Sequence, residues 1–178
     1  MSTVVTEAER AAEPPLPVEH VLAIASGLAH AAPLWCDQVG HDGPGRQWVR
    51  LIAHPRYEAW LIGWPPGHAT TAHDHGGSTG ALVVVEGELH ERTLGAVDVT
   101  RCLRAGDVVA LPADVVHDVA TGPTARATSI HVYSPPLGSM TFYDEDGVPD
   151  AVLAMSEDDA VLDHRAAARA LHPSSARA

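Results

Sequence analysis

Residues 67–87 of the 178-residue chain read GHATTAHDHGGSTGALVVVEG, and two histidines, His73 and His75, stand two positions apart in this stretch. In extended backbone, side chains at i and i+2 point to the same face, so both imidazoles can reach one point. A third histidine, His117, follows a turn at Gly106–Asp107 and a short apolar run. Neutral imidazole is a good ligand for iron, zinc, copper and nickel. The pattern therefore predicts a first-row metal site built from His73, His75 and His117.

Short runs of β-branched and aromatic residues surround this stretch, separated by Gly, Pro and Asp at intervals of roughly 8–12 residues, which is typical of an all-β sandwich or barrel. Helical spacing of apolar residues begins at Val18, after Pro17, and helical composition returns at residues 157–171. We predict a mainly β, single-domain small barrel over residues 18–178, with a motif core at 46–143, a helix at each end and a flexible arm at 1–17. The predicted strands are residues 48–54, 57–64, 81–94, 97–103, 107–111, 117–121, 126–134 and 140–143.

The overall charge excludes several classes of partner. The chain has 11 Lys+Arg and 23 Asp+Glu, a net charge of −12 without a basic cluster, which argues against nucleic acid. It has no apolar run near the roughly 20 residues of a membrane span, and the first twenty residues do not resemble a signal peptide. Two cysteines, Cys36 and Cys102, cannot form a disulfide framework, and we interpret both as core thiols. We expect a monomeric, cytoplasmic protein.

The frame around the histidines resembles the two sequence motifs of the cupins. The first motif has two of the histidines between spaced glycines, and the second has the third histidine after a glycine and a Pro-x-Asp: Gly67-x5-His73-x-His75-x4-Gly80-x6-Gly87 and Gly106-x5-Pro112-x-Asp114-x2-His117. The usual cupin has a glutamate, its fourth metal ligand, where this chain has Gly80. The resemblance implies a jelly-roll-like barrel with a metal site of three histidines. Such a site leaves the metal charge uncompensated and several positions open, which favours an anionic chelating ligand such as a thiolate with a second donor.

Three polar residues, Ser129, His131 and Tyr133, alternate along the segment TSIHVYS. They share one face of a strand and span about 13 Å. That face is either a solvent-facing stripe, which composition alone favours, or a relay of hydroxyl, imidazole and phenol inside the barrel. Either side could be the interior, since the opposite face carries Thr128, Ile130 and Val132. The following Ser134–Pro135 bond is a candidate cis peptide.

The strings HDHGGS, GELHE and SIHVYSPP are similar to those of the cysteine dioxygenases, the thiol dioxygenase branch of the cupins, over roughly residues 46–143. The resemblance implies that His73, His75 and His117 hold Fe(II). It implies that Ser129, His131 and Tyr133 form a triad beside the metal. It also implies that Arg50 binds the substrate carboxylate, for which a planar guanidinium is suited. The alternative for Arg50 is a surface cation.

One position departs from the mammalian-type members of this family. They carry a cysteine at the position of Gly80, and that cysteine is crosslinked to the tyrosine that matches Tyr133. Gly80 cannot form this thioether, so the resemblance is to the bacterial type, in which Tyr133 acts as a free phenol.

The activity implied is oxidation of L-cysteine by O₂ to cysteine sulfinic acid, with both oxygen atoms transferred to sulfur. A first alternative is a dioxygenase of 3-mercaptopropionate or another small thiol; related enzymes that prefer 3-mercaptopropionate carry Gln at the position of Arg50. A second is a non-catalytic or zinc-binding cupin module, since three histidines also suit zinc. The stripe of Ser129, His131 and Tyr133 favours an enzyme, because a binding module has no need of it.

Overall fold

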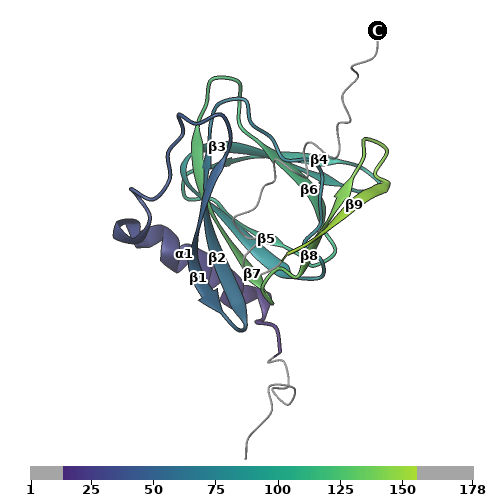
Figure 1. Cartoon of the computed structure of the whole chain (residues 1–178), viewed down its shortest axis with the longest axis horizontal. Coiled ribbons are helices and arrows are strands. Elements are labelled where there is room, and N and C mark those ends of the chain that lie inside the picture. The colour runs from purple at the N-terminus through teal and green to yellow at the C-terminus, as the bar shows by residue number, and fades with distance from the viewer. Residues whose placement is uncertain (1–13, 156–178) are drawn as a thin grey trace, which may run out of the picture.

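The strand-like segments in the middle of the chain form antiparallel strands that curve into a barrel, seen end-on in Figure 1. This computed structural model describes residues 14–155. A seven-stranded sheet has β1-β2-β7-β3-β4 as its main path, with β5 and β6 also paired to β3, and β8 and β9 form a separate hairpin. The elements are α1 Val18–His30, a short 3₁₀ helix η2 Ala32–Leu34, β1 Gln47–His54, β2 Tyr57–Trp64, β3 Thr79–Leu94, β4 Val99–Arg104, β5 Val108–Leu111, β6 Val116–Ala120, β7 Ala127–Ser134, β8 Ser139–Tyr143 and β9 Pro149–Ala154.

The long strand β3 joins the two halves of the barrel. Its first half pairs with β5 and β7, and its second half pairs with β4 and β6. The bend between the halves lies at Gly87, whose φ is +76° and where a Cβ would collide with the carbonyl oxygen of Arg126. Only glycine accepts both this φ and this close approach at low cost.

Helix α1 covers the outer face of the sheet and thereby decides which side chains face inward. Its buried residues pack on outward-facing side chains of β2, β3 and β7, among them Leu61, Val83, Ile130 and Val132. Because side chains alternate along a strand, Ser129, His131 and Tyr133 of β7 face the interior. The barrel interior holds the second apolar cluster, which includes Tyr133 and consists of Trp60, Trp64, Leu82, Val84, Leu89, Leu103, Leu111, Val119, Ala127 and Tyr133.

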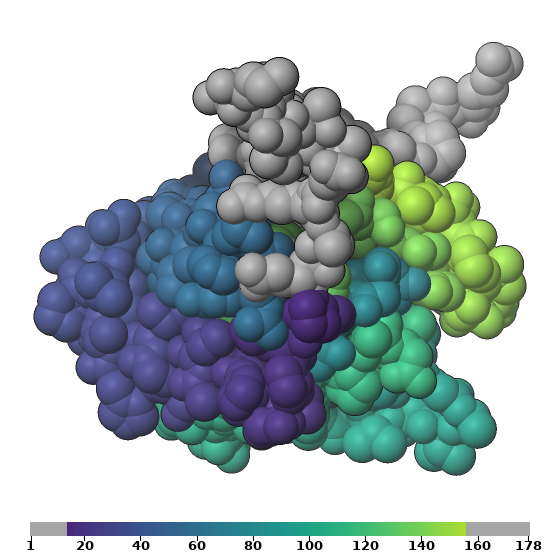
Figure 2. Space-filling view, turned by 90° about the horizontal axis from the view of Figure 1, so that it is seen from below, coloured from purple at the N-terminus to yellow at the C-terminus, as the bar shows by residue number. Residues whose placement is uncertain are grey.

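The surface view in Figure 2 shows α1 (purple) beside the blue β1–β2 region, with the yellow-green β8–β9 hairpin at the opposite end of this face. The described end of the N-terminal arm contacts the barrel, since the Leu16 N–H donates to Ser134 Oγ at 2.8 Å. None of the helices within residues 14–155 is both long and apolar enough to cross a bilayer.

The mainly β barrel and the N-terminal helix agree with the sequence analysis. Strand β9, which begins at a proline and was not among the predicted strands, pairs only with β8. The interpretation of both cysteines as core thiols is wrong: Cys36 is exposed and Cys102 is only partly buried, on β4. The neighbours in sequence do not decide this, because each cysteine has one apolar and one charged neighbour: Trp35 and Asp37 for Cys36, Leu103 and Arg101 for Cys102. The helix predicted at 157–171 lies outside the described residues.

Candidate metal centre

The structure brings His73, His75 and His117 together inside the barrel. His117 lies on β6, whereas His73 and His75 lie on the connection between β2 and β3. His73 nevertheless has extended backbone: its N–H donates to the His117 carbonyl at 2.9 Å, and its carbonyl accepts a hydrogen bond from the His117 N–H at 3.0 Å. This two-bond bridge fixes the two histidines relative to one another.

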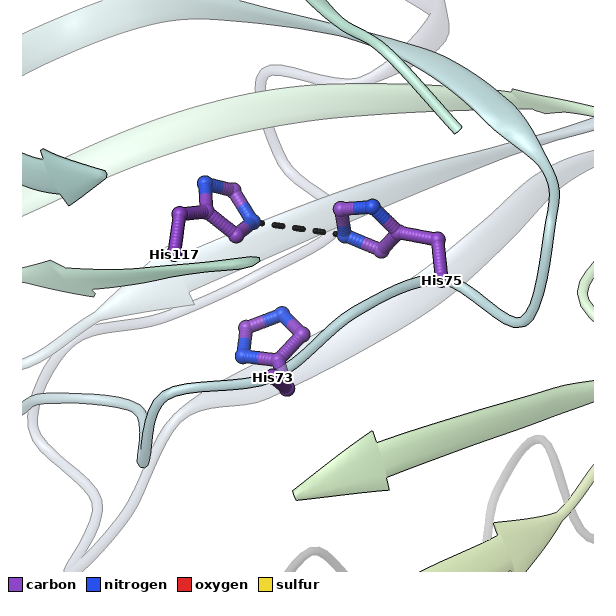
Figure 3. Close-up of side chains that lie close together, drawn as sticks. All are labelled: His73, His75 and His117. Carbon is purple, nitrogen blue, oxygen red and sulfur yellow. Dashed lines mark hydrogen bonds between the residues drawn. The ribbon is translucent and has the colours of Figure 1, made fainter. Parts of the chain in front are cut away.

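The three imidazoles converge on one point, as the close-up in Figure 3 shows. One ring nitrogen from each lies within 4.8 Å of the others, and all three side chains are buried. The Nε2 atoms of His75 and His117 are 3.3 Å apart. Three buried nitrogens at this separation form a donor set that suits a divalent first-row metal ion.

Two of the rings are held from behind by oxygen acceptors. His73 Nδ1 donates to the Thr71 carbonyl at 2.8 Å, and His117 Nδ1 donates to Glu91 Oε1 at 2.8 Å. A proton on Nδ1 leaves Nε2 as the ligand atom, so these contacts select the tautomer that a metal ion requires.

Glu91 lies directly behind His117, and the sequence patterns assigned no role to it. It is fully buried on β3 and also accepts a hydrogen bond from Arg101 Nε at 2.5 Å. Burial opposes ionisation of Glu91, but the hydrogen bonds from His117 and Arg101 outweigh it and lower the pKa of the carboxyl. The ionised carboxylate places negative charge behind one ligand, where it can partly compensate a cation. Its only sequence signal was its place in GELHE.

His75 differs from the other two histidines, because its Nδ1 is buried and has no hydrogen-bond partner among the described residues. Burial, and then the neighbouring His117, lower the pKa of His75 from 6.5 to about 3. The ring is therefore neutral at physiological pH, which is the state that binds metal.

A chain of hydrogen bonds runs along the inner face of β7 toward this centre. Trp64 Nε1 donates to Ser129 Oγ at 2.8 Å, Ser129 Oγ lies 2.9 Å from His131 Nε2, and the Tyr133 hydroxyl lies 3.1 Å from His131 Nδ1. The Tyr133 ring lies 4.9 Å from the His75 ring, measured between centroids. Ser129, His131 and Tyr133 are thus connected to one another and adjacent to the three histidines, with Trp64 as an additional anchor that the sequence analysis did not identify.

The Trp64 N–H donor determines the donor-to-acceptor direction of every hydrogen bond in this series. Because Trp64 donates to Ser129 Oγ, the Ser129 hydroxyl proton is available for His131 Nε2. Burial, followed by the nearby His117 and His75, lowers the pKa of His131 to about 3, so its single proton then lies on Nδ1 and is donated to the Tyr133 oxygen. Burial also raises the pKa of Tyr133. The phenol therefore stays protonated, with its own O–H free to point at a ligand.

Gly80 lies directly across from Tyr133 in the β3–β7 ladder. A Cβ at Gly80 would sit 2.9 Å from Tyr133 Cδ1, closer than two carbons normally approach. The absence of a side chain at Gly80 is what allows the Tyr133 ring to lie in this position.

Arg50 lies at the edge of the barrel on β1, across from Trp60. Its guanidinium carbon lies 5.5 Å from the centre of the Trp60 ring, and Nη1 is 4.0 Å from Glu58 Oε2. The Arg50 side chain is 31% exposed, whereas Glu58 is buried. The structure thus places an acidic neighbour beside Arg50 on the edge strand of the sheet.

Solved structures of cupins share this fold. A cupin superfamily protein from Desulfitobacterium hafniense DCB-2 matches with a TM-score of 0.50 and 16% identity over 57% of this chain and 87% of that chain. An oxalate oxidase in complex with glycolate matches at 0.50 and 20% identity over 61% of each chain. A putative mannose-6-phosphate isomerase from Ralstonia eutropha JMP134 matches at 0.50 and 21% identity over 57% of this chain and 94% of that chain. The chain therefore has the fold of this class, with a cluster of three buried histidines inside the barrel.

Within this class, the family model for cysteine dioxygenase type I matches residues 8–146, which is most of the chain. The protein belongs to that family and is a thiol-dioxygenase-like cupin.

Proposed function

We propose that the protein is an Fe(II)-dependent thiol dioxygenase that oxidises L-cysteine with O₂ to cysteine sulfinic acid. The observation that carries the proposal is the hydrogen-bonded chain from Trp64 through Ser129 and His131 to Tyr133, which ends beside three buried histidines. A protein that only binds a metal ion has no use for a phenol whose proton is directed in this way.

His73, His75 and His117 would hold the metal through Nε2, with Thr71 and Glu91 behind two of them. When bound, Fe(II) would supply open positions for a thiolate and O₂ and a route for electrons between them. The overall change is balanced without a further reductant, since a thiolate and O₂ together give a sulfinate. Sulfur is oxidised, and both oxygen atoms are retained.

The protein's own groups would orient the reactants. Tyr133 would donate a hydrogen bond to the substrate or to oxygen, and neutral His131 would hold the phenol in place without taking its proton. Arg50 would bind the carboxylate of the substrate through its planar guanidinium. The apolar interior around Tyr133 would exclude water and so strengthen these polar contacts.

Metal analysis of the purified protein, combined with O₂ uptake on addition of L-cysteine to the Fe(II)-loaded form, tests the proposal. We expect one iron per chain and thiol-dependent uptake of one O₂ per sulfinate formed. Full occupancy by zinc, with no thiol-dependent O₂ uptake by the iron-loaded protein, would instead identify a zinc-binding cupin module.

The choice of thiol is tested by kcat/KM for L-cysteine, 3-mercaptopropionate and cysteamine. L-Cysteine carries both a carboxylate and an amine, and each of the other two lacks one of these groups. We expect the highest value for L-cysteine. A clear preference for 3-mercaptopropionate would favour the alternative dioxygenase, and a preference for cysteamine would contradict a role for the carboxylate.

A further inference from the structure

A second arginine, Arg46, lies on the inner side of the barrel just before β1. Arg46, Trp48 and Arg50 occupy every second position of the chain, so their side chains share one face. Its guanidinium carbon lies 5.3 Å from the centre of the Trp48 ring and 4.9 Å from that of Trp64. Two indole rings therefore hold the guanidinium by cation–π contacts, in a fixed position inside the barrel.

Arg46 differs from the other arginines in residues 14–155, because its side chain has neither an acidic partner nor a hydrogen-bond acceptor there. The others either pair with a carboxylate or, as Arg56 does, donate to a backbone carbonyl. The pairs are Arg50–Glu58, Arg92–Asp118, Arg101–Glu91, Arg104–Glu88 and Arg126–Glu86, and the backbone bond is Arg56 to Pro14.

Leaving a partly buried cation without a counter-charge is costly. Burial lowers the pKa of Arg46 to about 10, so the group is still charged at physiological pH. The indole rings compensate only part of the lost hydration, and none of the five N–H donors of the guanidinium is used by a described acceptor. Such a group is prepared to receive an anion.

The position of Arg46 links it to the proposed reaction site. The Trp64 ring beneath it donates to Ser129, the first member of the chain that ends at Tyr133. A second unused donor lies on the same inner face: Trp60 Nε1 is buried and has no partner within the described part of the chain. Arg50, in contrast, already has Glu58 beside it.

We propose that Arg46 is a second carboxylate-binding residue of the barrel, so that ligand recognition depends on Arg46 and not on Arg50 alone. The expected ligand is a small thiol that carries a carboxylate. The carboxylate is inferred from Arg46 itself, whereas the thiol rests on the proposed function. Arg46 would hold the carboxylate by N–H donors on a guanidinium that its two indole neighbours keep in place.

The test measures binding to the zinc-loaded protein by calorimetry, so that no oxidation is needed and failure of dioxygenase activity would not affect the result. The two probes are 3-mercaptopropionate and its uncharged analogue 3-mercapto-1-propanol. We expect Arg46→Gln to raise the Kd of the carboxylate about 10-fold or more, as for loss of a hydrogen bond to a charged group, and to change that of the alcohol less than about 2-fold. Arg92→Gln, which removes an arginine paired on the surface, should change neither.

Two further variants keep the result decisive. Arg46→Lys retains the charge and much of the length but loses the planar guanidinium. It should therefore raise the Kd of 3-mercaptopropionate selectively, by a smaller factor than Arg46→Gln. This variant provides the test even if Arg46→Gln does not fold. Arg50→Gln is measured in parallel. The inference would be overturned if the Arg46 variants raised the Kd of both probes equally. It would also be overturned if the preference for the carboxylate over the alcohol were lost only in Arg50→Gln.

Discussion

Glu91 Oε1 accepts a hydrogen bond from His117 Nδ1 at 2.8 Å, and both side chains are almost completely shielded from solvent. The carboxylate holds the imidazole with its Nε2 directed toward His75. A carboxylate in this position fixes the orientation of a metal-binding histidine and increases its basicity. The buried pair therefore links strand β3 to the candidate metal centre through His117 of β6.

The first prediction concerns this pair. Glu91→Gln removes the negative charge while keeping the shape, and we expect the affinity for zinc to fall about 10- to 100-fold. Competition with a chromophoric chelator measures this affinity. Asp118→Asn is the matched control, since it disrupts an ion pair between the same two strands, Arg92–Asp118, outside the barrel. Equal losses in the two variants would mean that Glu91 acts only through general stability.

The second prediction uses the close approach of Gly80 to Tyr133. A Cβ at Gly80 would lie 2.9 Å from the Tyr133 ring, so Gly80→Ala must displace the ring or strain β3. We expect a loss of about 1–3 kcal/mol in the free energy of unfolding, as for other overpacked cores, together with a lower kcat. Gly27→Ala, on α1 with open space around it, should instead raise stability by up to about 1 kcal/mol. Urea unfolding compares the two, and an unaffected Gly80→Ala protein would contradict the tight packing.

The sequence was sufficient to predict what depends on local pattern. The alternation of side chains gave most of the strands, and the spacing around His73, His75 and His117 identified residues that the structure brings together. It could not decide which face of TSIHVYS is internal, because a polar stripe fits either a solvent-facing surface or a site inside the barrel. Only the packing of α1 on Ile130 and Val132 resolves that choice.

Other features depend on how distant segments are placed. Glu91 reaches His117 because β3 pairs with β6, and Trp64 reaches Ser129 because β2 pairs with β7. Neither register is encoded in a local motif. Arg46 likewise shows no signal in the sequence, since its lack of an acidic partner is a property of the assembled barrel.

The third prediction tests the phenol of Tyr133. Tyr133→Phe removes the hydroxyl 3.1 Å from His131 Nδ1 but keeps the ring packed in the interior. If Tyr133 donates to the reacting atoms, kcat should fall about 10²-fold with metal content unchanged. Tyr57→Phe, on the α1 side of β2, is the control and should retain activity. Full activity of Tyr133→Phe in O₂-uptake assays would exclude the phenol from the reaction.

The fourth prediction concerns the carboxylate. Arg50→Ala should raise KM for L-cysteine about 10-fold or more, because a charge-assisted hydrogen bond to the substrate is lost, while iron content stays the same. Glu58→Gln, which removes the acidic neighbour of Arg50, is expected to lower KM or leave it unchanged. Steady-state O₂ uptake at varied L-cysteine provides both values. An unchanged KM in Arg50→Ala would show that the carboxylate is bound elsewhere.

The last prediction follows from the low pKa of His131. Burial is the largest cause of its fall from 6.5 to about 3, so the folded protein keeps this ring neutral in mild acid. The unfolded chain binds a proton there below about pH 6.5. The folded state binds fewer protons, so the contribution to stability is complete above pH 6.5 and is lost as the pH falls toward 3. In the metal-free protein, the free energy of unfolding should depend less steeply on pH in His131→Gln than in wild type. Between pH 6 and 4 we expect the slope against pH to be smaller by up to about 1.4 kcal/mol per pH unit. Urea unfolding at several pH values measures the slope. His54→Gln, an exposed position on β1, should leave it unchanged, and the same slope in wild type and His131→Gln would contradict a neutral His131 in the barrel.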